Sequence, residues 1–520
     1  MCVFLASLAI ISAGAGSPGL ATAWVDPVAK IQAQDEAVYA AVSLGMARGD
    51  GWLTPKFLGR LALFKPPLLY WASAASVKVF GPGALALRVP ALLAGAGTVT
   101  VVFLWVAESG AVLMGLVGAL LTLSSHMVFV LSRVAITDAP LTFEVLVAVW
   151  ILARDPRLER TLSVWVFGIT SGAAMMTKGV AGAMPLLVLG GLCFWKERPQ
   201  PDRIALRRIF ETVGIAALVA APWHLYQLVV HPHWFWAEYV LSEHLTWGLT
   251  PPGQTTEEWS AWFYARRLFW LDPVLVVVGV VGVVRSRSRV VVGLLIVNSA
   301  AVLLFQYRNA AYLMPMFPGL AIAGATCWAG VDARRRPGGL PHLAVLALIA
   351  KVVFSGQAWG LPFAAEFVNP SYAGLEAYAG EGRGNELAIG EPDDQFYSAT
   401  LRLARVRYLY VDPREERTKL PLDFEDLGVT VTVGQFARLA ELTPMFAARL
   451  RAFDLDSVEP VATVILARSE AEVSELLRAH REIDFYAPAR WAALDGGVHE
   501  ARDGAPGRVW LRSRVVIQRP

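Results

Sequence analysis

The residues of this chain that could perform chemistry together lie in one stretch near the amino terminus. Asp35 and Glu36 form an acidic pair, and Lys65 follows thirty residues later, just before Pro66-Pro67. A carboxylate can take a proton from an incoming hydroxyl. A lysine nearby can neutralise a phosphate as it leaves. This combination indicates sugar transfer from a lipid phosphate, provided that the stretch lies at a membrane face.

The composition indicates a membrane protein. Of the 520 residues, 55% are hydrophobic and 17% are charged, whereas a soluble domain has about 25% charged residues. Apolar runs of near-spanning length recur, and a helix needs about 20 residues to cross roughly 30 Å of hydrocarbon. Buried helices of a soluble protein are the alternative, but they would not recur so often at this length. The sequence therefore predicts a polytopic α-helical membrane protein with about 11 transmembrane helices. The predicted spans cover residues 3–24, 84–107, 111–131, 139–153, 161–177, 179–195, 209–229, 268–284, 290–306, 310–330 and 340–360.

The short loops between these spans indicate the orientation, because Lys and Arg concentrate on the cytoplasmic side. Basic residues gather in the loops after the fourth, sixth, eighth and tenth spans, whereas the short loops opposite are nearly free of them. This asymmetry predicts that loops 25–83 and 230–267 and the tail 361–520 lie outside the cytoplasm. The predicted location is the bacterial inner membrane, with the active site facing the periplasm.

Several classes of function and site find no support. The net charge of +3 is small and gives no indication of nucleic-acid binding. All three cysteines, Cys2, Cys193 and Cys327, fall in apolar segments, which argues against an outer disulfide framework or a thiol metal site. Residues 1–24 have no basic residue before the apolar run, so a retained span is favoured over a cleaved signal peptide, although Ala21–Ala23 has the small-x-small form of a cleavage site.

Two helices are predicted in the outer loop 25–83. Apolar residues recur at helical spacing over residues 35–47, a pattern suited to a helix in the membrane interface. A second helix is predicted from Leu68 to Phe80, after Pro66-Pro67 and before a Gly-Pro-Gly turn. Both would hold Asp35 and Lys65 at the depth of the lipid headgroups. Taken singly, Asp35 could simply cap its helix and Lys65 could be a snorkelling residue.

The order of these motifs resembles a known family. DE-x-x-Y, a GDGW turn, KPPL-x-YW, FG and LRVPA occur in this sequence as in the first half of bacterial family 39 glycosyltransferases. That family includes relatives of protein mannosyltransferases and of the aminoarabinose transferase that modifies lipid A. The resemblance extends over about residues 20–330. Further similar motifs are Ser132–Glu144, Thr177–Pro185, Ala221–His224, Phe235–His244 and Arg308–Ile322.

The resemblance implies a fold and a substrate class. It implies a GT-C fold, which would comprise the transmembrane domain of residues 1–360. It implies a polyprenyl-phosphate sugar as donor, and the family's acceptors are lipids, glycans or proteins. The reaction would take place at the surface of the lipid bilayer. Direct displacement with inversion at the anomeric carbon is the predicted mode, because it needs no covalent enzyme intermediate.

Three acids are assigned to the catalytic group. Asp35 would be the general base, because partial desolvation at the interface makes a carboxylate more basic. Glu36 points about 100° away from Asp35 on a helix, so an orienting or hydrogen-bonding role suits it better. Asp138 stands at the outer end of the fourth predicted span, where an acid usually faces the protein interior.

Three cations are assigned to the donor phosphate. Lys65 and Lys178 both fall at outer membrane–water boundaries and can bind a phosphate as compact point charges. Arg133 could add a forked contact to the same group.

Further candidates in the outer loops are Tyr39, Glu243 and His244. His244 is a weak candidate metal ligand, since zinc generally takes three or four ligands. Phe64 stands where the lipid A-modifying relatives carry a glutamate that helps to hold a metal, and Thr246-Trp247 replace an arginine of those relatives. The sequence therefore predicts no certain cofactor and at most a weakly bound divalent metal.

The tail of residues 361–520 has a different composition. Strand-like runs such as VATVILA and RVWLRSRVVI surround a helical run begun by a Ser-x-x-Glu pattern. These patterns predict a small extracytoplasmic α/β domain. Two other functions stay open: a polytopic transporter, for which Glu144 and Lys351 are the interior ionisable residues, and an oligosaccharyltransferase acting en bloc. A non-catalytic membrane scaffold is a further alternative.

Overall fold

The structure is a computed structural model. It describes residues 1–15, 36–49, 51–57, 60–108, 112–194, 204–246, 262–285, 288–305, 308–332 and 340–354, together with seven short strands after residue 385. Asp35, the predicted general base, lies outside the described residues and directly precedes the first described residue of helix α2.

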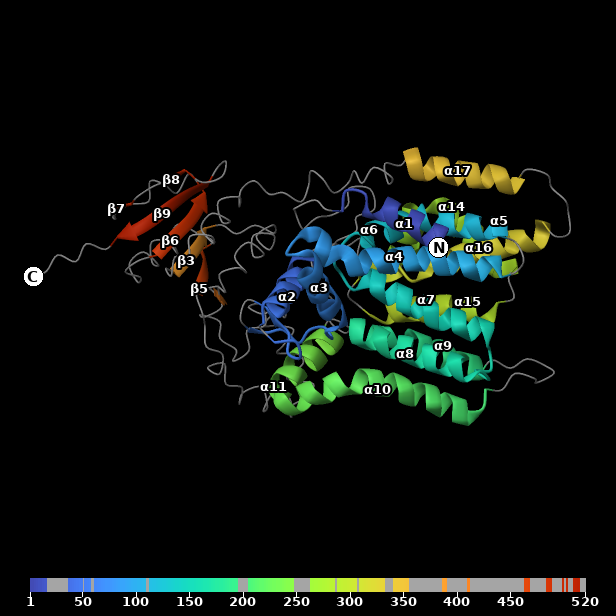
Figure 1. The fold of residues 1–520 in the computed structure, drawn as a ribbon, viewed down its shortest axis with the longest axis horizontal. Helices are drawn as coiled ribbons and strands as arrows, with labels where there is room; N and C mark the ends of the chain where they lie inside the picture. Colours follow the sequence, from blue (N-terminus) through green and yellow to red (C-terminus); the bar gives the residue numbers. More distant parts are fainter. Residues whose placement is uncertain are drawn as a thin grey trace, which may run out of the picture.

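Most of the described chain forms a bundle of helices that run roughly side by side (Figure 1). Every predicted apolar segment overlaps at least one of these helices. The bundle helices are α1 (Cys2–Ser12), α4 (Ala84–Ala107), α5 (Val112–Leu123), α6 (His126–Leu131), α7 (Asp138–Arg154), α8 (Thr161–Lys178), α9 (Met184–Phe194), α10 (Leu206–Val230), α13 (Phe263–Leu271), α14 (Pro273–Arg285), α15 (Arg289–Leu304), α16 (Met316–Asp332) and α17 (Leu340–Phe354).

Length and composition allow four of the described helical stretches to cross a membrane, or five if the bent pair α13–α14 counts as one span. Five shorter apolar helices accompany them. The chain is thus mostly helical with several apolar helices, while the number of spans stays a prediction.

Two predicted spans are broken in the structure. The segment 111–131 is divided between α5 and α6 at Ser124-Ser125, and the segment 268–284 bends by 109° between α13 and α14. The second break has a local cause, because the residue before a proline is disfavoured in the α conformation. Here that residue is Asp272, and its carboxylate accepts a hydrogen bond from the N–H of Leu275, in the first turn of α14 (3.2 Å).

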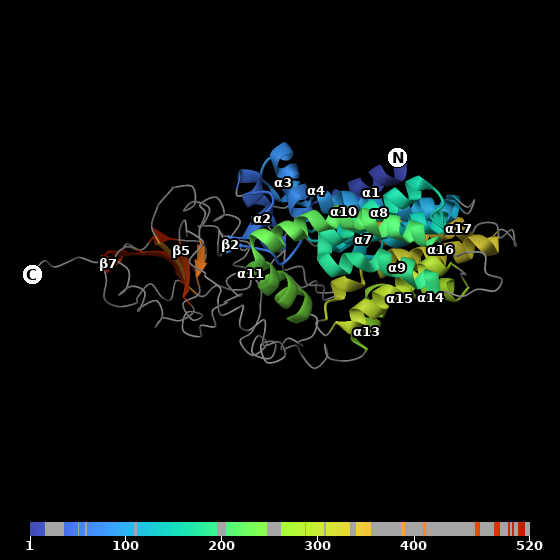
Figure 2. The same ribbon diagram turned by 90° about the horizontal axis from the view of Figure 1, so that it is seen from below.

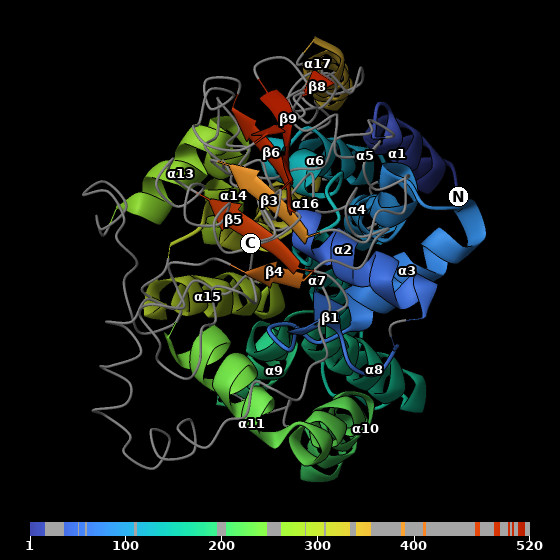
Figure 3. The ribbon, with the colours of Figure 1, turned by 90° about the vertical axis from the view of Figure 1, so that its left-hand side faces the viewer.

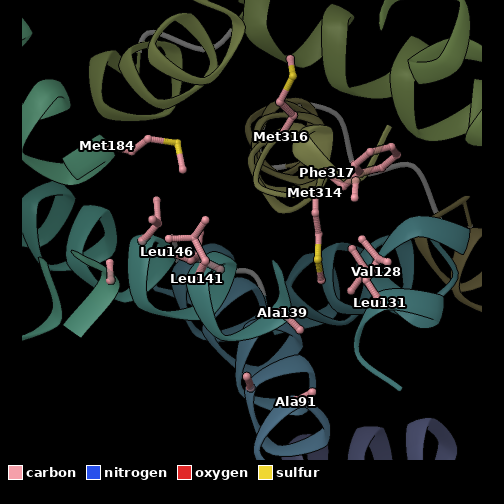
Figure 4. Close-up of a cluster of buried hydrophobic side chains, with 14 of the residues drawn as sticks. Ala91, Val128, Leu131, Ala139, Leu141, Leu146, Met184, Met314, Met316 and Phe317 are labelled. Atoms are coloured by element: carbon pink, nitrogen blue, oxygen red, sulfur yellow. The ribbon is translucent and has the colours of Figure 1, made fainter. Parts of the chain in front are cut away.

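Helices α7 and α16 lie at the centre of the bundle. Seen along the bundle, α7 packs between α4 and α8, and α16 packs against α5 and α14 (Figure 3). Met314, just before α16, and Phe317, in its first turn, are fully buried among Val128, Leu131 and Ala139 (Figure 4). This apolar core includes Ala139, the second residue of α7, and so fixes the end of α7 that carries the predicted site residue Asp138.

Small residues allow close packing of α8 against α10, which run alongside one another (Figure 2). A Cβ added at Gly168 would lie 2.7 Å from the Cβ of Ile215, and one added at Gly172 would lie 2.6 Å from the Cβ of Val219. The other face of α10 exposes large apolar side chains such as Phe210 and Leu218. Such a face suits contact with lipid.

The outer loop 25–83 contains both predicted helices, α2 (Glu36–Arg48) and α3 (Leu68–Phe80), as well as a short hairpin of β1 (Lys56–Phe57) and β2 (Arg60–Leu61). The apolar residues of α2 are covered by protein, and its position at the membrane surface stays a prediction. Val42 and Met46 are fully buried in the protein core, together with Leu61 and Leu63. The helical period of apolar residues reflected burial against the protein, and a hydrophobic pattern by itself does not say which apolar medium covers it.

The described part of the tail forms a mixed sheet with the strand order β4-β5-β3-β6-β9-β7, and β8 pairs with β9. Its strands are β3 (Glu386–Gly390), β4 (Leu409–Val411), β5 (Thr463–Ala467), β6 (Ile483–Pro488), β7 (Val498–His499), β8 (Arg502–Asp503) and β9 (Arg508–Arg514). The pairs β3–β5, β3–β6 and β4–β5 are parallel. The predicted helix of the tail lies outside the described residues, so the α/β domain stays a prediction.

Candidate functional site

Lys65 is held at one end of the bundle by the π-helix η2 (Phe235–Thr246). Its ammonium forms an ion pair with Glu243, and the two side chains are 14% and 19% exposed. Glu238 of the same helix is fully buried, and its carboxylate accepts a hydrogen bond from the backbone N–H of Leu63. Two acids of η2 thus contact the segment that carries Lys65, one through the backbone and one through the ammonium.

Lys178 is paired with an acid as well. It is the last residue of α8, and Asp138 is the first residue of α7; their Nζ and Oδ1 atoms are 2.7 Å apart. The two side chains are 14% and 11% exposed. The ammonium also lies 5.0 Å from the ring centroid of Tyr312. The structure therefore unites two predicted site residues, Asp138 and Lys178, in one contact.

His244 connects η2 to the turn that follows Lys178. Its Nδ1 contacts the carbonyl of Tyr239, which can only accept, so Nδ1 carries the proton. Its Nε2 is then free to accept from the N–H of Val180, at 3.4 Å. Gly179 has φ +55°, and a Cβ there would lie 2.7 Å from His244 Nε2, so the close approach requires glycine.

Burial keeps His244 neutral. Burial, with smaller contributions from the charges of Lys65 and His224, lowers the pKa of His244 to about 4, although the hydrogen bond to Tyr239 acts to raise it. The same imidazole therefore stays a hydrogen-bond acceptor at neutral pH. A protonated ring would face the N–H of Val180 with a second donor.

Tyr239 and His224 extend this network into α10. The Nδ1 of His224 lies 2.7 Å from the carbonyl of Ala220, which fixes the proton on Nδ1, so Nε2 accepts from the hydroxyl of Tyr239 at 2.7 Å. Burial raises the pKa of Tyr239. The hydroxyl stays protonated, and η2 is tied to α10 at neutral pH.

The GDGW turn is attached to the same end of the bundle. Trp223 and Gln227 of α10 both donate to the carbonyl of Leu53, at 2.8 and 2.6 Å. Trp71 of α3 donates to the carbonyl of Trp52 at 2.6 Å. The turn between α2 and the Lys65 segment is therefore anchored from two helices.

Glu36 lies in a different environment, entirely inside the protein. Its two carboxylate oxygens accept from Nε and Nη2 of Arg88, at 2.7 and 2.9 Å, and both side chains are 0% exposed. The backbone N–H of Ala135 donates to the same carboxylate at 2.9 Å. This contact anchors the first turn of α2, directly after Asp35, so a direct part of Glu36 in catalysis finds no support in its surroundings.

Arg133 is also placed apart from the two lysines in its described contacts. It is fully buried, donates from Nη1 to the carbonyl of Ile11 at 3.0 Å, and packs its guanidinium 4.9 Å from the ring centroid of Phe129. These contacts join α1 and α6, so its predicted contact with the donor phosphate gains no support. Tyr39 is buried and packs its ring against Phe64 and Tyr70, behind Lys65.

Comparisons with known proteins find relatives over part of the sequence. Residues 32–237 match the sequence profile of a family described as dolichyl-phosphate-mannose-protein mannosyltransferase. An undecaprenyl phosphate-alpha-4-amino-4-deoxy-L-arabinose arabinosyl transferase of Pseudomonas paraeruginosa is 31% identical over 242 residues, which are 44% of this chain and 42% of that protein. An uncharacterized protein of Aquifex aeolicus is 27% identical over 198 residues, 38% of this chain and 39% of that protein.

Likeness to solved structures covers the whole chain. ArnT from Cupriavidus metallidurans, in a crystal structure bound to undecaprenyl phosphate, has a TM-score of 0.65 at 14% identity and covers 100% of this chain and 99% of that one. Its apo structure has a TM-score of 0.61 and covers 98% and 97%. The resemblance to the GT-C family 39 is confirmed. The chain spans about two fifths of the length of the curated relatives that it matches in sequence.

Three residues of this site were not predicted from the sequence: Glu238, Tyr239 and His224. Each lies in a motif that carried the resemblance, either APWH or FWAEYVLSEH. The signal for Glu238 was present, since an acid in an otherwise apolar stretch needs a partner when buried. Its partner, the N–H of Leu63, lies 175 residues away in sequence.

The described residues contain no group of three or more His, Cys, Asp and Glu side chains that could hold a metal. Two further histidines of the outer loop are possible additional ligands beside His244. His231 lies 3.4 Å from the hydroxyl of Thr54, and the side chain of His233 lies outside the described residues. Metal binding by His244 stays a prediction without support from this ligand set.

Proposed function

We propose that the chain is a membrane glycosyltransferase that moves a single sugar from a polyprenyl-phosphate donor to a hydroxyl or amine of a lipid, glycan or protein acceptor. The observation that carries this proposal is the arrangement of the two lysines. Lys65 and Lys178 come from distant segments, and η2 contacts both segments through Glu243 and His244. Two ammonium groups that are gathered at one end of an apolar bundle suit a lipid phosphate.

Each of these residues has a separate role in the proposed reaction. Asp35 takes the proton of the acceptor hydroxyl while its oxygen attacks the anomeric carbon. The bond between that carbon and the phosphate oxygen breaks, and the polyprenyl phosphate leaves with the electron pair. Lys65 and Lys178 stabilise the negative charge that develops on it. Glu36, locked by Arg88, fixes the chain next to Asp35.

The polyprenyl-phosphate donor is supported by the names of several relatives, which are undecaprenyl-phosphate arabinosyl transferases, and by the crystal structure of ArnT bound to undecaprenyl phosphate, which shares the fold. A transporter and an en-bloc oligosaccharyltransferase are not favoured by these relatives. Inversion at the anomeric carbon follows from the single displacement.

The proposed reaction takes place outside the cytoplasm, at the bacterial inner membrane. Support comes from the arginine-rich loops, which lie at the opposite ends of the predicted spans from Lys65 and Lys178. In this arrangement residues 1–360 form the membrane domain and 361–520 an outer domain. A cysteine-free chain with single cysteines at Ser286 or Ser398 tests the orientation. An impermeant thiol reagent applied to intact cells should label only the second; labelling of the first alone would place the site in the wrong compartment.

Two substitutions test the chemistry with a purified chain and a polyprenyl-phosphate sugar. Asp35→Asn should lower the transfer rate about a hundredfold to ten-thousandfold while undecaprenyl phosphate still binds. Lys178→Ala should lower kcat/KM about tenfold to a hundredfold, because a charge-assisted contact to the phosphate is lost. Glu159→Gln, which breaks an exposed ion pair with Arg157 in a loop that the arginine bias places in the cytoplasm, is the control and should leave transfer unchanged. Near-normal transfer by Asp35→Asn would leave Asp35 as a helix cap only, since asparagine caps about as well.

A further inference from the structure

Both lysines assigned to the donor phosphate already have carboxylate partners in the described part of the chain. Lys65 is paired with Glu243, and Lys178 with Asp138. Two ammonium groups and two carboxylates have no net charge. Among the described residues, a phosphate that approaches these two pairs therefore meets ammonium groups that are already balanced by carboxylates, unless one carboxylate leaves its lysine.

The surroundings of Glu243 allow its side chain to leave while the backbone stays in place. The backbone of η2 is held on both sides of Glu243, by the bond between Glu238 and Leu63 N–H and by the contacts of His244. The side chains of Glu243 and Lys65 are nonetheless 19% and 14% exposed. A partly exposed ion pair on a fixed backbone can exchange partners by rotation of side chains alone.

We propose that Glu243 is an internal competitor of the donor phosphate for Lys65. When the donor binds, its phosphate takes the place of the Glu243 carboxylate at the Lys65 ammonium. When the sugar has been transferred, Glu243 returns to Lys65 and displaces the polyprenyl phosphate. This inference rests on the proposed function and adds to it a step of product release.

The charges of donor and product give a reason for such a competitor. The donor is a phosphodiester with one negative charge, whereas the product is a phosphate monoester with about −1.5 to −2 charges at pH 7. The product therefore binds the two ammonium groups more strongly than the donor does. A carboxylate that reoccupies Lys65 offsets part of this extra attraction and prevents the product from blocking the site.

Glu243→Gln tests the proposal by whether it raises or lowers the affinity for undecaprenyl phosphate. Glutamine retains the size of the side chain but loses the charge that competes with phosphate. Undecaprenyl phosphate should bind the variant about two- to fivefold more tightly than the wild-type chain, the range expected for loss of a partly exposed ion pair. Affinity is measured by titration of undecaprenyl phosphate into the full chain in lipid nanodiscs. The steady-state kcat should fall while the single-turnover transfer rate stays within about twofold, because only release is slowed.

Two controls accompany this variant. Glu108→Gln removes the partner of Arg154 in an exposed ion pair, with side chains 39% and 49% exposed, at a helix end that the arginine bias places in the cytoplasm; it should not change affinity. In a Lys65→Ala background, Glu243→Gln should no longer tighten binding, since the competition is for Lys65.

Weaker binding of undecaprenyl phosphate by Glu243→Gln would overturn the proposal, because Glu243 would then help to build the site. Unchanged binding would overturn it as well, provided that Lys65→Ala and Lys178→Ala both weaken binding; the proposed function would then stand without this step. If neither lysine affects binding, the proposed function itself fails, and the inference fails with it.

Discussion

The ion pairs in two regions of the molecule differ in a way that separates structure from function. Glu36 and Arg88 form a two-pronged pair that is completely buried and also bound by the N–H of Ala135. Lys65 and Glu243 form a pair that remains partly exposed beside η2. Breaking a buried pair leaves an uncompensated charge in the interior, whereas a partly exposed pair can be replaced by water or by a ligand. The first suits an anchor and the second a binding site.

The same contrast separates two residues that are adjacent in sequence. Asp35 and Glu36 form one acidic motif, but a carboxylate engaged with Arg88 cannot serve as a base in an exchanging site. The acidic pair is therefore best understood as a proposed base next to its anchor. The predictions below test whether burial distinguishes the two kinds of ion pair.

The largest effect is expected from Arg88→Leu. It leaves Glu36 buried without its cation, which should lower the free energy of unfolding by about 3–5 kcal/mol. The melting temperature in detergent, followed by fluorescence-detected size-exclusion chromatography, measures the change. Arg154→Leu, which breaks a pair with side chains 49% and 39% exposed, is the control and should change stability by less than about 1 kcal/mol. Equal losses of stability in the two variants would show that burial does not distinguish the two kinds of ion pair.

Lys351→Met should have an intermediate effect. Lys351 is 34% exposed, but its partner Asp272 is only 2% exposed, with Nζ–Oδ2 at 3.1 Å. Asp272 would keep the bond from Leu275 N–H and lose its cation, at a cost of about 1–3 kcal/mol. The same melting assay measures this. A loss of stability as large as that of Arg88→Leu would show that an ion pair with one buried partner stabilises the fold as much as a fully buried pair.

Gly179→Ala tests the backbone of the turn that follows Lys178. A Cβ would meet His244 Nε2 at 2.7 Å, and φ is +55°; we expect a loss of about 1–2 kcal/mol in stability together with weaker binding of undecaprenyl phosphate. Gly190→Ala is the matched control, since a Cβ there meets nothing within 4 Å. Unchanged lipid binding by Gly179→Ala would argue that the position of the turn does not matter to Lys178.

The smallest change in stability is expected from Glu243→Gln, below about 1 kcal/mol, because the pair that it breaks is partly exposed. Its melting temperature should equal that of the wild-type chain within the error of the assay, even though lipid affinity changes. A destabilisation comparable with that of Lys351→Met would mean that the Lys65 pair is an anchor as well.

Much of the helical framework could be predicted from local sequence. The predicted Leu68–Phe80 and 84–107 coincide with α3 and α4, because apolar runs, Pro-Pro and Gly-Pro-Gly act within a few residues. The break at Asp272-Pro273 had a local signal too. The pairing of Asp138 with Lys178 and of Lys65 with Glu243 had no such signal, since each joins residues from different segments of the chain.

The sequence by itself determined the membrane class, most helix positions, the family resemblance and which ionisable residues lie in its motifs. These follow from length, hydrophobicity and residue order, which act along the chain. Only the tertiary structure decided that α2 is covered by protein, that Arg133 contacts α1, and that η2 connects Lys65 with the turn after Lys178. The physical reason is that burial and charge pairing depend on which distant segments meet. The type of a hydrophobic or acidic residue does not indicate which residue it will contact.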